Sequence, residues 1–316
     1  MAKRKTTVRK TSRKTKEPVA APGRMPLYGG QAVIEGVMMR GARYMAVAMR
    51  APNGKIMLHS EKLGPIYQSR AARIPFVRGL VLLWDALALG SRALTLSANT
   101  QAGEDEKIEG APLALTMIIS LSFAIGLFFL APAGISHLVE GFFNWPSWAG
   151  NIFEGFVRLS ILIGYLLTIG RIEEIKRVFG YHGAEHKTIN AFEDKAKLTP
   201  GVVTKYPIEH PRCGTAFLLT VVVFSIILFA LIGPMPLLPR LALRVLLIPV
   251  LASLAYEYLR WTARHFDNPL VRLLVAPNLA LQRLTTRPPD KKMLEVGIAA
   301  FNAMRKLELK ADKTAA

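Results

Sequence analysis

The sequence predicts a mainly α-helical, polytopic membrane protein with about four transmembrane helices, both termini in the cytoplasm, a small N-terminal β-hairpin element and cytoplasmic helices. Three observations predict this fold class: 51% of the 316 residues are hydrophobic, 41 Lys and Arg stand against 22 Asp and Glu for a formal net charge of +19, and long runs carry no charge. A soluble domain can be apolar or basic, but both properties in one chain indicate membrane-embedded and cytoplasmic parts. This combination argues against an ordinary soluble enzyme.

Part of the positive charge lies at the N-terminus. Residues 1–24 contain nine Lys and Arg and a single acid, Glu17. We expect residues 1–27 to form a disordered basic tail close to anionic lipid headgroups, with an RNA or ribosome contact as the alternative.

A small cytoplasmic β element is predicted within residues 28–70. Residues 31–39 are rich in Val, Ile and Met, and residues 44–50 lead through Pro52-Asn53-Gly54 into residues 55–59. An Asn-Gly pair between apolar runs is the strongest short-range signal for a hairpin.

The next segment, residues 71–110, is expected to hold an amphipathic helix and a linker. Residues 74–98 are apolar enough to suggest a further span, but Arg78, Asp85 and Arg92 recur every seven residues. This spacing places the three charges on one helix face. We therefore expect the helix to lie on the membrane surface or to pack against the bundle.

The membrane region is predicted over residues 111–259. Residues 113–130 and residues 213–239 lie in long uncharged runs, which are close to or above the roughly 20 apolar residues that cross a bilayer. Two weaker candidates lie around residues 150–170 and 241–259, where charged residues interrupt the apolar pattern.

The charge of the loops favours all four crossings. Residues 141–149 contain no Lys or Arg and include Trp145 and Trp148, which suit a membrane interface. Residues 171–212 contain eight basic residues, and the stretch after Leu259 contains eleven. The positive-inside rule then places both termini in the cytoplasm of a multi-pass protein of the bacterial cell membrane.

The C-terminal segment, residues 260–316, is expected to form basic cytoplasmic helices. Asp290 follows Pro288-Pro289 and can cap a helix that runs to about Leu309.

The densest polar motif is residues 181–187, within the basic segment after the second predicted span. His182 and His186 stand at i and i+4, so that both imidazoles project from one face of a helix, with Glu185 beside them. The H-x-x-E-H pattern matches the inverted zinc-hydrolase motif, in which the histidines bind a divalent metal such as zinc and the glutamate acts as general base. The alternative is a hydrogen-bonded polar network of these residues with Asn190 near the membrane interface.

A catalytic zinc also needs a third protein ligand. Four residues are candidates: Glu193, His210, Cys213 and Glu257. Each has another interpretation, because Cys213 alone suits a buried apolar position and His210-Pro211 suits a turn. Glu257 could instead pair with Arg260, and Glu35, in an apolar strand, could pair with Arg40 or Arg43.

Nucleotide binding has no support. Gly29, Gly30 and Gly36 do not have the spacing of either glycine-rich phosphate-binding motif.

Five motifs together resemble the YqhQ-like family of bacterial membrane proteins: GGQAVIEGVMMRG at 29–41, PFVRG at 75–79, YHGAEHK at 181–187, HPRCG at 210–214 and LTTR at 284–287. The resemblance covers residues 28–301 approximately and omits the tail. The family is a domain of unknown function labelled a predicted metal-dependent enzyme. That label implies metal at His182, Glu185, His186, His210 and Cys213, without naming a reaction.

Two functions of different classes follow. The first is a membrane-embedded, metal-dependent enzyme, expected to be a hydrolase, whose site faces the cytoplasm. The second is a non-enzymatic scaffold or assembly or insertion factor, whose basic surface contacts a ribosome, nucleic acid or a membrane protein. A transporter is a third, weaker possibility, because few charges lie within the predicted spans.

Overall fold

The computed structural model describes residues 28–65, 69–71, 74–102 and 110–315. Most of these residues lie in helices, and the strands are confined to the first part of the described chain. The predicted basic tail, residues 1–27, lies outside the described residues, as does most of the linker before the first apolar helix.

The N-terminal element is a four-stranded antiparallel sheet in the order β1-β2-β3-β4. The strands are β1 (Gly29–Val33), β2 (Gly36–Arg40), β3 (Tyr44–Arg50) and β4 (Ile56–Lys62). The predicted hairpin is confirmed as β3–β4, with Gly54 in its turn at φ +80°, a conformation that glycine adopts without strain. The motif at 29–41 forms a second hairpin, β1–β2, which the apolar run alone did not reveal.

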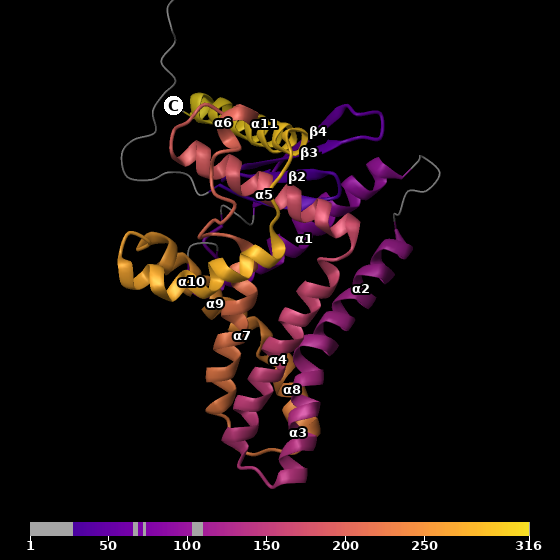
Figure 1. Ribbon diagram of the computed structural model, residues 1–316, viewed down its shortest axis with the longest axis vertical. Helices are drawn as coiled ribbons and strands as arrows, with labels where there is room; N and C mark the ends of the chain where they lie inside the picture. Colours follow the sequence, from indigo (N-terminus) through magenta and orange to yellow (C-terminus); the bar gives the residue numbers. More distant parts are fainter. Residues whose placement is uncertain (1–27, 66–68, 72–73, 103–109, 316) are drawn as a thin grey trace, which may run out of the picture.

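Helices cover both faces of this sheet. Side chains alternate along a strand, so Val37 and Met39 face the helices α5 (Glu173–Glu193) and α11 (Lys291–Ala315), while Met38 and Val47 face α1 (Val77–Gln101). All of these side chains are buried. The sheet, α5, α11 and α1, with the short α6 (Pro200–Val203), form a unit that we call the head (Figure 1).

Helix α1 connects the sheet of the head to the membrane-type helices. Its Leu89 and Ala93 are buried against the sheet, and a side chain at Gly79 would collide with the backbone of Ser253 in α9 (Ile248–Arg264). Arg92 is ion-paired with Glu61 of β4. The predicted helix is therefore present, and it packs against the sheet on one side and against α9 on another.

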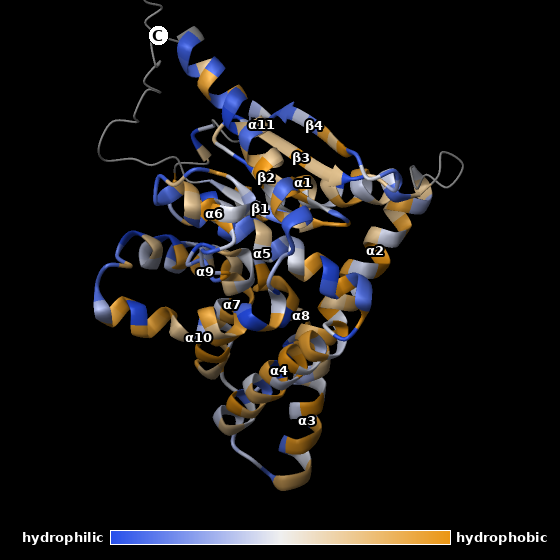
Figure 2. Ribbon diagram, turned by 45° about the horizontal axis from the view of Figure 1, so that its top comes forward, coloured by the Kyte–Doolittle hydropathy of each residue, from blue (hydrophilic) through white to orange (hydrophobic). Residues whose placement is uncertain are grey.

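The remaining helices form an elongated bundle below the head (Figure 1). In chain order they are α2 (Ala111–Ile125), the π-helical turn η4 (Gly126–Leu130), α3 (Ala131–Phe143), α4 (Ser147–Ile169), α7 (Gly214–Ala230), α8 (Leu237–Leu246), α9 and α10 (Pro269–Thr285). Figure 2 shows hydrophobic residues along α2, α3 and α4, and hydrophilic residues on α11 and β4.

Two helices in the described ranges are long and apolar enough to cross a membrane: the 33-residue segment Ala111–Phe143 and the 23-residue helix Ser147–Ile169. A third is possible if α8 and α9, which are bent by 42°, count as one span. Helix α7 is apolar but has only 17 residues, because the uncharged run 213–239 breaks after Ala230 and restarts as α8. The structure thus contains two or three helices of this kind by length and composition, where the sequence predicted four.

The bend between α8 and α9 has a local cause. Pro249 occupies the first turn of α9, where its missing N–H cannot continue the hydrogen bonding of α8. The predicted span over 241–259 is consequently distributed over two helices.

The C-terminal helix is capped at its start and held to the start of β3 near its other end. The predicted cap is confirmed, because the Asp290 carboxylate accepts a hydrogen bond from the Met293 N–H at 2.7 Å. Near the other end, Glu308 accepts hydrogen bonds from the backbone N–H groups of Arg43 and Tyr44 at 2.6 and 2.9 Å. The helix continues to Ala315, past the predicted end near Leu309.

We predict that Glu308→Ala lowers the free energy of unfolding of the head by about 2–4 kcal/mol, because two backbone N–H groups and the Nε–H of Arg43 lose their acceptor. Thermal unfolding and limited proteolysis of the purified protein in detergent measure the effect. Lys306→Ala, an exposed position on the same helix, is the control and should change little. Equal stability of the two variants would contradict the prediction.

Candidate metal centre

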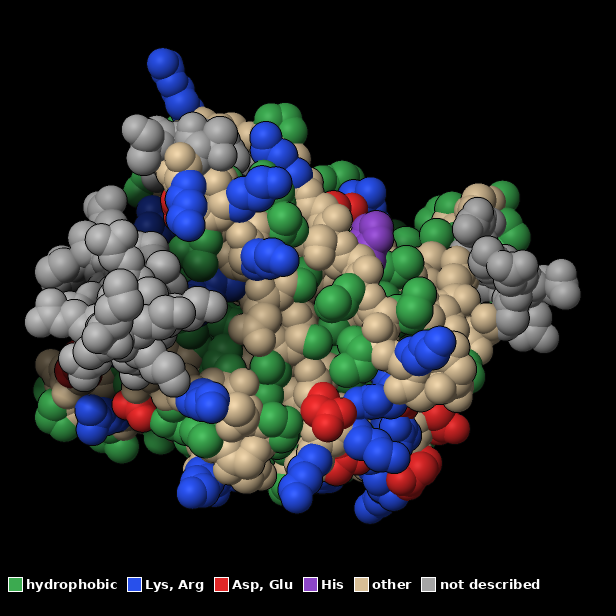
Figure 3. Space-filling model, turned by 90° about the horizontal axis from the view of Figure 1, so that it is seen from above, with side chains coloured by type: hydrophobic (Ala, Val, Ile, Leu, Met, Phe, Trp, Pro, Cys, Tyr) green, Lys and Arg blue, Asp and Glu red, His purple; other side chains and the backbone are tan. Residues whose placement is uncertain are grey.

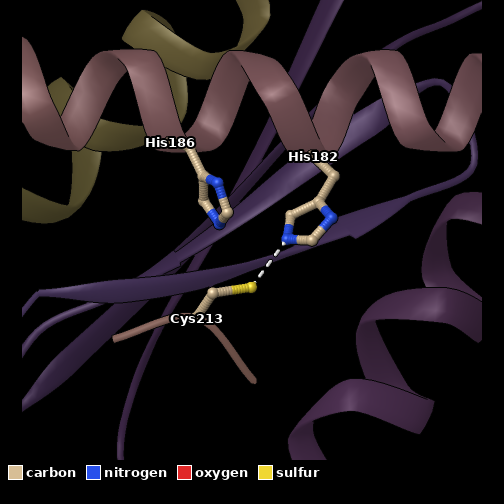
Figure 4. Close-up of side chains that lie close together, drawn as sticks. All are labelled: His182, His186 and Cys213. Atoms are coloured by element: carbon tan, nitrogen blue, oxygen red, sulfur yellow. Dashed lines mark hydrogen bonds between the residues drawn. The ribbon is translucent and has the colours of Figure 1, made fainter. Parts of the chain in front are cut away.

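Helix α5 carries the polar motif across the interior of the protein. Glu173 and Glu174 lie in its first turn, where acidic side chains stabilise the helix end. Its middle is buried between the sheet and α11 on one side and the segment leading into α7 on the other. Because His182 and His186 are one turn apart, they project from the same face, toward the N-terminus of α7 (Figure 4).

Three side chains converge at this face. Ligand atoms of His182, His186 and Cys213 all lie within 4.8 Å of one another, and His182 Nε2 is 3.1 Å from Cys213 Sγ. Figure 4 shows both imidazoles and the thiol directed toward a common region. Two ligand atoms of a tetrahedral zinc are about 3.3–3.8 Å apart, so the observed separation needs little adjustment.

Backbone carbonyl groups orient both imidazoles. His182 Nδ1 donates a hydrogen bond to the carbonyl of Thr285 at 2.8 Å, and His186 Nδ1 donates one to the carbonyl of Ile208 at 2.5 Å. Since a carbonyl oxygen can only accept, the proton of each neutral ring lies on Nδ1 and the Nε2 lone pair is available. This arrangement of a ligand and its outer partner is typical of metal-binding histidines.

One of the two Nε2 atoms is buried without a hydrogen-bond partner. His186 Nε2 makes no hydrogen bond to any described residue, although its side chain is almost fully buried. Burial lowers the pKa of His186 and nearby Cys213 opposes this shift, so the imidazole is held in the neutral form that a metal requires. The donor set therefore fits a divalent metal.

Cys213 is placed by the start of α7. It is the N-cap residue, and its Sγ accepts a hydrogen bond from the Thr215 N–H at 3.4 Å. The N-terminus of a helix stabilises negative charge, which suits a sulfur ligand. Both nitrogen and sulfur donors are typical of zinc sites.

Glu185 lies beside the three donor residues but faces the sheet. Its buried carboxyl group lies against Gly30 of β1. Burial raises the pKa of Glu185, and the nearby His182 and His210 oppose the shift. A Cβ atom at Gly30 would lie 2.5 Å from the Met38 carbonyl oxygen and 2.9 Å from the Glu185 carboxyl carbon, so glycine is required there.

His210 is near the cluster but does not share its donor geometry. Its ring centroid lies 5.7 Å from that of His186, and its Nδ1 accepts a hydrogen bond from the Arg212 N–H at 3.4 Å. Its Nε2 lies 3.6 Å from a Glu193 carboxylate oxygen, and Glu193 is ion-paired with Arg212. Burial lowers the pKa of His210 to about 4. Neither His210 nor Glu193 therefore joins the three convergent donors.

Glu257, another candidate third ligand, lies elsewhere. It is ion-paired with Arg78 of α1, whose Nε lies 2.6 Å from its Oε1, and it accepts a hydrogen bond from the Phe76 N–H at 3.0 Å. The expected role as a ligand is thus replaced by a contact between α1 and α9, and the main partner is Arg78 rather than Arg260. Helix α1 packs against α9 in the folded chain, and this contact brings Arg78 close to Glu257.

Glu35 also has a different partner from the two that the sequence suggested. Arg177 of α5 donates to both of its carboxylate oxygens, at 2.5 and 2.6 Å, in place of Arg40 or Arg43. The hydroxyl of Tyr181 donates to it as well, at 3.1 Å. The Arg177 guanidinium keeps the pKa of Glu35 below its usual value.

Four further groups position the site. The carbonyls of Ile208 and Thr285 orient the imidazoles, and the Gln282 side chain bonds both the N–H and the carbonyl of His210, at 3.0 and 2.9 Å. The fourth is Gly30. Thr285 and Gly30 lie in the motifs at 284–287 and 29–41, which the sequence offered only as signs of a family. A carbonyl acceptor such as that of Ile208 leaves no pattern in a sequence, because every residue has one.

Comparisons with known proteins agree on one family. Residues 74–307 match the family described as "Protein of unknown function (DUF1385)". The chain is also 34% identical over 303 residues to a Bacillus subtilis (strain 168) protein described as "Uncharacterized protein YqhQ", which covers 90% of this chain and 93% of that protein. No solved structure shows a significant match.

We predict that Gly183→Ala disrupts the site without touching a donor residue. A Cβ atom at Gly183 would lie 2.2 Å from the carbonyl oxygen of Arg287, so α5 must move away from the 285–287 segment that orients His182. The free energy of unfolding should fall by about 1–3 kcal/mol. Thermal unfolding measures this, with Gly201→Ala as the control.

The control is matched because Gly201 also lies in a helix of the head and has open space where a Cβ would be. A Gly183→Ala variant as stable as Gly201→Ala would show that the close approach does not constrain α5.

Proposed function

This chain belongs to the DUF1385 family, as its YqhQ-like motifs predicted, and we propose that it is a membrane-embedded, metal-dependent enzyme with hydrolase chemistry at the cytoplasmic face. The observation that carries the proposal is the convergence of His182, His186 and Cys213, together with the buried and unpartnered Nε2 of His186 within the described chain.

The three convergent residues would hold the metal, and Glu185 would transfer a proton. A bound divalent cation such as zinc would supply Lewis-acid polarisation of a substrate. The raised pKa of Glu185, caused first by burial, suits a group that takes a proton and returns it. The carboxyl group lies against Gly30 of β1, and the nearby His182 and His210 favour its charged form.

We also propose that the head faces the cytoplasm and that the chain crosses the membrane four times. Two helices meet the length and composition of a span, and the bent pair and α7 would supply the others. Segment 171–212 begins just after α4, and segment 260–316 begins within the last residues of α9; they contribute α5 and α11 to the head. The positive-inside rule favours this orientation.

A metal analysis tests the enzyme proposal. Protein purified in mild detergent from metal-supplemented cells should contain about one equivalent of zinc, iron, manganese or cobalt, measured by plasma mass spectrometry. His186→Ala and Cys213→Ser should reduce this below about a tenth of an equivalent, because two of the three donors cannot hold a structural or catalytic ion tightly. His59→Ala, a half-exposed histidine on β4, is the control.

Cobalt substitution gives a second readout that does not depend on activity. A sulfur-to-cobalt absorption band should be present in the wild type and in Glu185→Gln, and absent in Cys213→Ser. Metal content near zero in the wild type, or unchanged in His186→Ala, would contradict the proposal and favour a polar network of His182, His186 and Cys213.

The scaffold function rests on a different observation. Figure 3 shows Lys and Arg side chains spread over the end of the molecule that carries the sheet, with the acidic ones mainly toward one edge. A basic cytoplasmic surface attracts anionic lipid, nucleic acid or a ribosome. Purification at low and high salt should then recover a stoichiometric partner at low salt that high salt removes; recovery of none at either would count against this function.

A further inference from the structure

The part of the bundle farthest from the head contains a buried ionic cluster, which is separate from the candidate metal centre. It consists of five side chains from α3, α4 and α8: Glu140, Glu154, Arg158, Arg240 and Arg244. Arg158, Arg244 and Glu154 are at most 1% exposed. Helix α8 lies beside α3 in the lower half of the bundle (Figure 1).

Glu154 is the centre of this cluster. It accepts from Arg158 at 2.7 Å, from two nitrogens of Arg244 at 2.9 Å each, and from Arg240 at 3.2 Å. Glu140 accepts from two nitrogens of Arg240, at 2.7 and 2.8 Å. These two carboxylates are therefore shared among three guanidinium groups.

The cluster has one positive charge in excess. Three guanidinium groups against two carboxylates leave a formal charge of +1, and the other polar contacts, from Ser225 and Asn151, are neutral. A buried charge without a counter-charge is costly in an apolar environment, and Arg does not lose its proton in proteins. The simplest compensation is a bound anion.

Two donors of the cluster are also unused. Arg244 Nη1 and Arg240 Nε are buried and make no hydrogen bond to any residue that the structure describes. The Arg244 guanidinium stacks on the Phe229 ring at 3.8 Å from its centroid, which covers one face of the guanidinium. Its N–H groups lie in the guanidinium plane, so stacking leaves them without an acceptor.

A cavity of about 80 Å³ lies beside these arginines. Arg240 and Arg244 line it together with Glu140, whose carboxylate Arg240 already binds, and with His137, Ser147, Asn151 and residues 232–235 of the turn between α7 and α8. It is close to the α3–α4 turn, where Phe142, Trp145 and Trp148 are exposed. Exposed aromatic residues at the end of apolar helices are typical of the headgroup level of a bilayer.

We infer that this cavity binds one phosphoryl group, with Arg240 and Arg244 as its donors. Phosphate oxygens accept several hydrogen bonds from planar guanidinium groups and carry the negative charge that the cluster lacks. The group could belong to a lipid headgroup of the outer leaflet or to a free phosphate. The inference does not depend on the metal centre.

Gly233 allows a test that leaves the ionic cluster intact. It lines the cavity, has an ordinary backbone conformation, and a Cβ there would meet nothing within 4 Å. Gly233→Asp places a negative charge at the cavity, whereas Gly233→Asn has the same shape without the charge. Arg244→Gln removes the unused donor together with the bonds to Glu154 and Asn151, and is compared with Arg264→Gln, an exposed arginine on α9.

Two probes distinguish the sources of the phosphoryl group. Sodium phosphate is titrated against sodium chloride at equal ionic strength, with the unfolding temperature of the detergent-purified full chain as readout. Phosphatidylglycerol is added in detergent, and the lipid retained per protein is counted by native mass spectrometry. We expect at least one probe to bind saturably to the wild type and to Gly233→Asn, and about tenfold more weakly to Gly233→Asp.

The pattern across the variants decides the outcome. Charge-sensitive binding of phosphatidylglycerol alone assigns the site to a lipid, and charge-sensitive binding of inorganic phosphate assigns it to a soluble anion. The inference is overturned if neither probe binds the wild type, or if Gly233→Asp binds both as tightly as Gly233→Asn. Because the Gly233 variants lose no contact, a folding defect in Arg244→Gln does not remove the test.

Discussion

The buried polar face of α5 connects the head to the bundle. The imidazole N–H groups of His182 and His186 donate to carbonyls of Thr285 and Ile208, and the Lys187 ammonium donates to carbonyls of Thr204 and Tyr206. Polar groups buried without partners are costly, so α5 is stable in this position only while the segments before α7 and after α10 stay in place. The sheet, the helix and the bundle are consequently held in one arrangement.

The same requirement explains why the candidate centre lies where it does. Cys213 begins α7, and residues 285–287 link α10 to α11, so both contacts come from chain segments that join the bundle to the head. A centre built in this way is sensitive to movement of either part. The proposed phosphoryl site is at the far end of the bundle, and its burial obeys the same rule, since the arginines of α8 are stable there only with acceptors for their charge.

Local patterns were sufficient for several features of the fold. Asn53-Gly54 predicted the β3–β4 hairpin, Asp290 predicted the start of α11, and the spacing of His182 and His186 placed both rings on one helix face. These features depend on contacts between residues a few positions apart, which the sequence displays directly. Long apolar runs likewise indicated membrane-type helices, but the break after Ala230 and the bend at Pro249 reduced the four expected crossings to two or three candidates.

Such local patterns could not predict contacts between residues that lie far apart in the chain. Cys213, His210, Glu193 and Glu257 were all candidates for a third ligand, and only packing brought Cys213 to the histidines while it paired Glu257 with Arg78. Glu35 met Arg177 for the same reason, because an ion pair depends on where helices and strands cross. Residue type and short-range spacing therefore indicated which residues were candidates for a site, whereas the crossing of α5, the sheet and the bundle helices determined which of them lie together.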